Sequence, residues 1–161
     1  MRNTLAMRAC VVLATAAVVG HCLAGCGGPP AAARRSVEVA TVVLLEADRE
    51  TAERYAVAAA EALDASGSIA EYRERLAPWD ALELALRVAQ SAVLSASAVV
   101  EAWDAGGRDR WAAAAGCMVE ALGRVREGLE ALGLRVPPEL ASVIDLVVGV
   151  GAAACPDSGG A

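Results

Sequence analysis

The sequence predicts an all-α fold, a small antiparallel bundle of about four helices, and two observations predict it. Apolar residues recur at helical spacing over most of residues 36–155, with few prolines or glycines inside the repeats. Short segments that contain glycine or proline separate these repeats, as the connections between antiparallel helices do. Alanine dominates the composition and phenylalanine is absent, so the expected core consists of Ala, Val and Leu.

The N-terminal segment has the parts of a secretory signal peptide. Arg2 and Arg8 supply positive charge, residues 9–23 form a nearly uncharged apolar run, and the small residues Ala24 and Gly25 follow. An uncleaved membrane anchor is the alternative, but the run is shorter than the about 20 residues that span a bilayer. We therefore expect the bundle to follow a signal peptide that is cleaved.

The signal ends in Leu23-Ala24-Gly25-Cys26, which resembles the lipobox of bacterial lipoproteins. In that family the chain is cut before the cysteine, whose sulfur carries a diacylglycerol and whose new amino group is often acylated. The resemblance implies lipidation at Cys26 and attachment to a membrane of the cell envelope. Asp after the lipidated cysteine resembles an inner-membrane retention signal. Gly27 stands there instead, which favours the outer membrane, facing the periplasm, if the envelope has one.

Composition divides the chain into four parts. Residues 1–25 are the expected signal peptide, and residues 26–35, which contain two prolines, form a flexible tether. Residues 36–155 form the helical bundle, and residues 156–161 a disordered tail.

The first half of the bundle is expected to contain a long helix and a short one. Ser36 is predicted to cap the long helix, which ends before Gly67. Ser68 and Glu71 form a capping-box pattern for a short helix, and Pro78 then opens a new one. Helical spacing places the following residues on the buried face of the long helix, together with a misplaced Asp48: Leu45, Ala52, Tyr55, Ala59 and Ala62.

The next two helices, about 78–104 and 109–132, are expected to form a hairpin around Gly106-Gly107, with Asp109 as the second cap. The first carries a 4-3 apolar repeat at Leu82, Leu86, Ala89, Val93, Ala96, Val100 and Trp103. The second carries it at Trp111, Ala115, Met118, Leu122, Val125, Leu129 and Leu132. The two repeats mirror each other, which places Trp103 level with Trp111 at the tip and Leu82 level with Leu132 at the other end.

The last helix is predicted to open at Pro137-Pro138 and to run to about Ala154, after a Schellman-type stop at Gly133. It is apolar on most sides, so we expect it to dock on the hairpin, with the first long helix completing the bundle. Close docking requires small residues, and one side of the preceding helix offers Ala114, Ala121 and Gly128.

Two cysteines remain after lipidation of Cys26 and removal of the signal. Cys117 and Cys155 lie at similar helical distances from the turn between their helices, so we expect a disulfide between them. Two buried thiols are the alternative.

Charge and residue types restrict the chemistry. The chain has a formal charge of −6, and loss of Arg2 and Arg8 makes the mature chain more acidic, which argues against nucleic acid as a partner. The only histidine, His21, lies in the signal segment, so neither a Ser-His pair nor a histidine metal site can form. We predict no catalytic residue, no metal site and no cofactor.

These observations predict a lipid-anchored envelope protein that has a structural or protein-binding role and is not an enzyme. The chain is also similar to small alanine-rich lipoproteins encoded in phage and mobile-element genomes, which implies lysis or exclusion of competing phage as an alternative. A small enzyme that uses Asp and Glu in an interhelical cleft is a further alternative. Trp103 and Trp111 are expected to close the end of the bundle, the alternative being exposed anchors for a partner.

Overall fold

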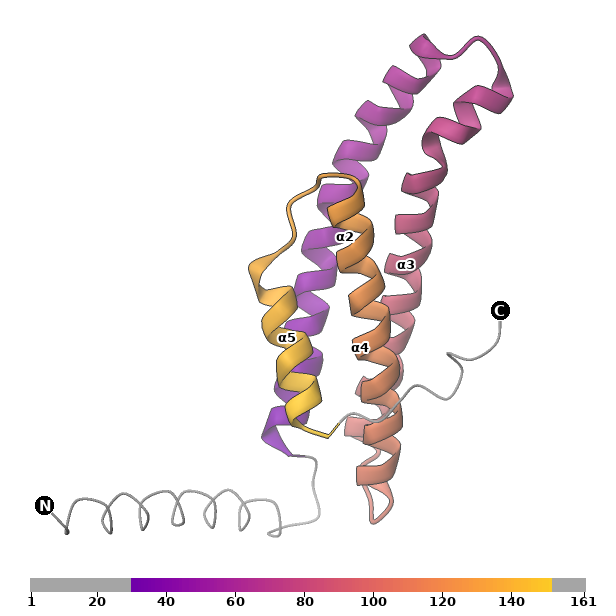
Figure 1. Ribbon diagram of the computed structural model, residues 1–161. Coiled ribbons are helices and arrows are strands. Elements are labelled where there is room, and N and C mark those ends of the chain that lie inside the picture. The colour runs from indigo at the N-terminus through magenta and orange to yellow at the C-terminus, as the bar shows by residue number, and fades with distance from the viewer. Residues whose placement is uncertain (1–29, 152–161) are drawn as a thin grey trace, which may run out of the picture.

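The computed structural model describes residues 30–151, which form four helices and no strand (Figure 1). The helices are α2 (Ala31–Ala65), α3 (Ile69–Glu101), α4 (Gly107–Ala131) and α5 (Pro138–Gly149). The predicted all-α bundle is therefore confirmed. The expected signal peptide, Cys26, Cys155 and the expected tail lie outside the described residues.

The helices are arranged so that α2 and α4 lie diagonally across the bundle. α3 packs against both of them on one side, and α5 packs against both on the other. α5 therefore contacts α4 of the α3–α4 hairpin but not α3. The prediction that the last helix docks on the hairpin holds for one of its two helices.

α2 begins at Ala31, earlier than the predicted cap at Ser36. The alanines that precede Ser36 are the strongest helix formers, and the backbone amide of Ala33 already donates to the Pro30 carbonyl at 2.9 Å. The Ser36 hydroxyl lies inside the helix and donates to the Ala32 carbonyl at 2.8 Å. The prediction of a cap at Ser36 is wrong, and residues 31–35 belong to a helix and not to the predicted tether.

The buried face of α2 also differs from the predicted one as far as Ala52. Leu45 and Ala52 are exposed, and Asp48, which the predicted face would have buried, is exposed as well. The face in contact with the bundle carries no charge, and its hydroxyl groups of Ser36 and Thr51 are satisfied by carbonyls one turn earlier. It consists of Ala33, Ser36, Val37, Ala40, Val43, Leu44, Ala47 and Thr51, with Ala62 further on.

α3 starts at the predicted capping box. The Ser68 hydroxyl accepts from the Glu71 amide at 3.2 Å, and the Glu71 carboxylate accepts from the Gly67 amide at 3.0 Å. The helix then continues through Pro78, so the predicted break between two helices at that point is wrong. Pro78 is exposed. Proline has no N–H to donate to the carbonyl one turn earlier, and at this exposed position water can donate to that carbonyl instead.

The facing sides of α3 and α4 agree with the predicted 4-3 repeats. The predicted residues from Leu82 to Ala96 on α3 and from Trp111 to Leu129 on α4 are buried. The remaining residues of the two repeats are partly buried and pack against this core: Val100, Trp103 and Leu132. Leu82 lies opposite Gly128, so the register at this end differs from the predicted one by about one turn. The antiparallel hairpin is confirmed.

The turns show which residues end each helix. The Asp104 carboxylate accepts from the Gly106 amide at 2.8 Å and pairs with Arg110 at 2.6 Å, so Asp104 and not Asp109 holds the α3–α4 turn. Gly133 has a φ of +64°, and the amide of Leu134 reaches back to the Leu129 carbonyl at 2.9 Å, which confirms the Schellman stop. α5 ends at Gly149, before the predicted end.

Candidate functional site

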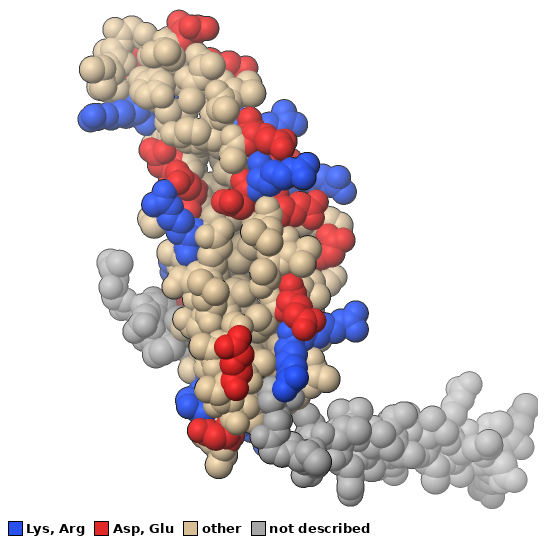
Figure 2. All heavy atoms as spheres, turned by 180° about the vertical axis from the view of Figure 1, so that it is seen from behind, with Lys and Arg blue, Asp and Glu red and all other residues tan. Residues whose placement is uncertain are grey.

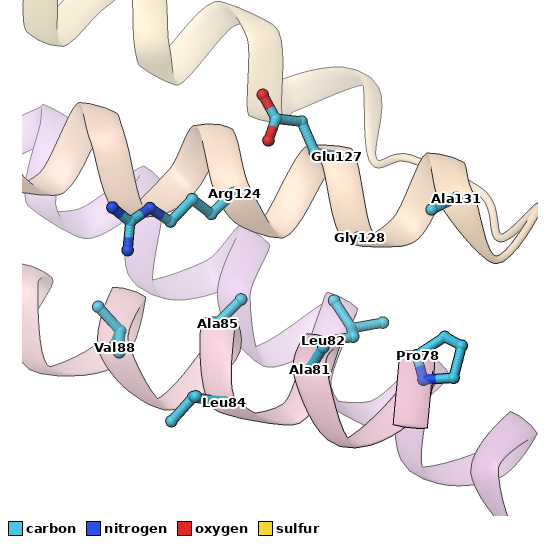
Figure 3. Close-up of a pocket in the computed structure, with 10 residues that line it drawn as sticks. All are labelled: Pro78, Ala81, Leu82, Leu84, Ala85, Val88, Arg124, Glu127, Gly128 and Ala131. Atoms are coloured by element: carbon cyan, nitrogen blue, oxygen red, sulfur yellow. The ribbon is translucent and has the colours of Figure 1, made fainter. Parts of the chain in front are cut away.

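An apolar groove lies between α3 and α4 (Figure 3). It has a volume of about 440 Å³, within the range of ligand and side-chain pockets. Small residues form it, because their short side chains leave the space between the two helices unfilled. The groove is lined by Pro78, Ala81, Leu82, Leu84, Ala85 and Val88 of α3 and by Arg124, Glu127, Gly128 and Ala131 of α4.

The floor of the groove is held by a close contact between Leu82 and Gly128. A Cβ placed on Gly128 would lie 2.9 Å from the Leu82 Cδ1 atom, so a larger residue there would force the buried Leu82 side chain to shift. Figure 3 shows Leu82 pointing across the gap towards Gly128, whereas Glu127 points away from α3. Gly128 was predicted to face the last helix. It faces α3 instead, because the 4-3 repeat of α4 turns this side towards its hairpin partner.

The polar atoms of the groove lie at its edge. Arg124 forms an ion pair with Glu120 at 2.6 Å, both on α4. Leu84 and Val88 are exposed along the α3 side. An apolar surface with charges only at the rim suits the apolar side chains of a second helix better than a polar small molecule.

A second hollow, of about 300 Å³, lies between α2 and α3 and is lined by two acids and a tyrosine. Asp48 and Tyr55 line it from α2, and Glu83 lines it from α3. Burial raises the pKa of Tyr55, and the negative charges of Asp80 and Glu83 raise it further. Both acids are exposed, and Glu83 pairs with Arg87. No group of three or more metal-ligating side chains occurs within residues 30–151.

The three tryptophans take different positions. Trp111 is fully buried in the core, as predicted for a residue that closes the end of the bundle. Trp103 is half-buried and covers Gly107, where a Cβ would come within 2.7 Å of its ring. Trp79 lies edge-on to Tyr55, with ring centres 6.2 Å apart, between α2 and α3. These contacts favour a packing role for the three tryptophans over a role as exposed anchors for a partner.

The predicted site residues are only partly within the described chain. Cys26 and Cys155 lie outside it. Cys117 lies on α4, next to the buried seam, and is disulfide-bonded. Its pairing with Cys155 stays a prediction.

Sequence reasoning missed the α3–α4 groove. Its signal was present: alanines stand at positions 81 and 85 of α3, one turn apart, and Gly128 stands on the facing helix. Spacing alone did not reveal that these small residues share one side of the hairpin.

Comparison with known proteins adds no relative. No family model matches the chain, and neither a curated protein nor a solved structure matches it.

Proposed function

We propose that the chain is a lipid-anchored protein of the bacterial cell envelope, in the outer membrane where the envelope has one, that binds a partner protein through the α3–α4 groove. The observation that carries the binding role is the groove itself, an exposed apolar hollow along two helices with its charges at the edge. The lipobox-like run at Cys26 supports the anchor.

The partner that fits this groove is an amphipathic helix that inserts large apolar side chains. The alanines and the glycine that line the groove leave room between the two helices for the large apolar side chains of a partner helix. The solvent-exposed side chains of Leu84 and Val88 would become buried on binding. Their burial would supply the hydrophobic gain that drives association.

Mass spectrometry of the mature N-terminus tests the anchor. We expect cleavage before Cys26 and an acyl mass on that residue, both abolished in a Cys26→Ser variant. A mature chain that keeps Met1, or that is cut elsewhere without acyl mass, would reject lipidation. Fractionation that finds the acylated form only in the inner membrane would reject the outer-membrane assignment.

A crosslinked pull-down from detergent-solubilised envelope tests the groove. A Leu84→Asp variant places a charge on the groove and should lose a partner that the wild-type chain captures. Leu63→Asp is the matched control, because Leu63 is as exposed as Leu84 but lies at the α2–α3 turn, away from the groove. Equal capture by both variants would show that the groove is not the binding site.

A further inference from the structure

An uncharged and exposed surface crosses α2 and α3 in the half of the molecule nearest the start of α2. No charged residue occurs within residues 39–45 of α2 or within residues 88–100 of α3. Val42, Leu45 and Leu94 lie in these stretches and are 63%, 62% and 71% exposed. We call these three residues the α2–α3 apolar face.

The residues of this face lie on one side of the molecule. Leu45 stands two helical turns before Ala52, and Leu94 stands three turns after Glu83. Ala52 and Glu83 line the same solvent-filled hollow between α2 and α3, so Leu45 and Leu94 lie on that side as well. Figure 2, which views the molecule from behind, shows an uncharged stretch near mid-height, with acidic and basic side chains both above and below it.

The structured chain begins close to the predicted anchor. Because α2 starts at Ala31, only five Cα–Cα steps separate it from Cys26, and these span at most about 18 Å. Val42 lies eleven residues further along the helix, which is about 16 Å. A lipid on Cys26 would therefore hold the α2–α3 apolar face within reach of the membrane surface.

The end of the bundle nearest the anchor is poorly suited to touch lipid. The start of α2 and the α3–α4 turn lie at this end (Figure 1), and both carry exposed charges. Placing charges against hydrocarbon is unfavourable, whereas burying exposed Val and Leu is favourable. The exposed charges at this end include Arg34, Arg35, Glu38, Glu101, Asp104, Arg108, Asp109 and Arg110.

We propose that the α2–α3 apolar face rests on a zwitterionic lipid surface, so that the bundle lies along the membrane and does not stand upright on it. This inference depends on the proposed lipid anchor, which supplies the second membrane contact that a small apolar face needs for stable attachment. The lipid is zwitterionic because an acidic chain is repelled by anionic headgroups. The α3–α4 groove then remains open to a partner at the membrane surface.

Fluorescence quenching by brominated lipid tests this orientation. The full mature protein is extracted in mild detergent and reconstituted into phosphatidylcholine vesicles with and without brominated acyl chains. Leu94→Trp places a reporter on the α2–α3 apolar face, and Leu63→Trp is the matched control, since Leu63 is 68% exposed on the same helix pair at its far end. The native tryptophans contribute the same background to both variants.

We expect the added signal of Leu94→Trp to be quenched at least about twofold more than that of Leu63→Trp, at low and at high salt. Equal quenching in an acylated, vesicle-bound protein would overturn the orientation and leave the anchor intact. A protein that lacks an acyl mass and does not bind vesicles would overturn both proposals. A Leu94→Trp emission that shifts to the blue with protein concentration, without quenching by lipid, would assign the face to a second copy and also reject the inference.

Discussion

The half of the molecule near the start of α2 and the opposite end, where α2 and α3 continue alone, are built on different principles (Figure 1). In the first, four helices share one core whose largest fully buried side chains include Trp111, Leu44, Met118, Leu122 and Leu140. The second region comprises residues 59–77, which we call the two-helix arm. Within this arm only Ala62 and Leu76 are buried.

The difference shows that the two regions draw stability from different sources. Each large side chain buried in the four-helix core contributes about 1.5–3 kcal/mol relative to its exposed state. The arm has little such burial and depends on helix-forming alanines, the capping box at Ser68 and the ion pair between Glu71 and Arg75 at 3.0 Å. Damage to the core should therefore be global, and damage to the arm local.

A buried charge should give the largest contrast between the regions. Leu122→Asp places a carboxylate among fully buried neighbours, where an unpaired charge costs several kcal/mol, so we expect the whole bundle to unfold. Leu76→Asp should loosen the two-helix arm and leave the four-helix core folded. Circular dichroism and near-ultraviolet spectra distinguish these results. Global unfolding by both variants would contradict the division into two regions.

The predicted disulfide should affect the core and not the arm. A bridge between Cys117 and Cys155 closes a loop of about 38 residues, so Cys155→Ser should cost about 3–4 kcal/mol in denaturant unfolding. Reductant should lower wild-type stability by a similar amount and leave the variant unchanged. Peptide mapping without reductant checks the pairing directly. A map that joins Cys117 to a different cysteine would reject it.

Two glycines of α4 give a sharper test of core packing. Gly123→Ala meets no atom within 4 Å, so we expect a gain of up to about 1 kcal/mol from helix propensity. Gly128→Ala has the same propensity gain, but its Cβ would lie 2.9 Å from Leu82. It should be less stable than Gly123→Ala by about 1–3 kcal/mol. Thermal unfolding measures both, and equal stabilities would show that the α3–α4 contact is looser than described.

Loss of the cap should be visible only in the arm. Ser68→Ala removes the oxygen that accepts from the Glu71 amide, at a cost of about 1 kcal/mol. Hydrogen exchange should quicken at the start of α3 and stay unchanged in α4. Ser95→Ala is the control, because the exposed Ser95 hydroxyl only donates to the Ser91 carbonyl within α3 and caps no helix end. Faster exchange throughout the bundle would show that the arm and the core unfold together.

Acid should weaken the same cap by a smaller amount. The hydrogen bond from the Gly67 amide, helped by Arg75, lowers the pKa of Glu71 below its ordinary value of 4.5. The charged carboxylate therefore stabilises the arm fully above about pH 4.5, and this contribution is lost as pH falls through the lowered pKa. Carboxyl NMR should show a depressed midpoint for Glu71, and Glu71→Gln should remove the acid sensitivity of the arm. A midpoint at or above 4.5 would contradict this.

Sequence reasoning predicted the hairpin of α3 and α4 because its signals agree with each other. The 4-3 repeats, the glycines at positions 106 and 107 and the stop at Gly133 all indicate the same topology. Each repeat also lies on a helix with one clearly apolar side. Nothing but local spacing is needed to identify such a side.

The same reasoning was wrong where the local signal was ambiguous. In α2, alanine is abundant on every side, so Leu45 suggested a buried face that is in fact exposed. Pro78 looked like a helix start, but tertiary packing of α3 against α2 and α4 carries the helix through it. The α3–α4 groove depends on which small residues meet across two helices, and a single sequence does not contain that information.

One feature of α2 links the two regions. From Ala31 to Ala65 it is a single unbroken helix of 35 residues, about 52 Å long. Because the helix is continuous, the orientation of its first turn also sets the position of its last turn. A rotation of about 10° at the Ala31 end would carry the far end of such a helix through about 9 Å. The length and continuity of α2 therefore tie the position of the arm to the orientation of the first turn of the helix.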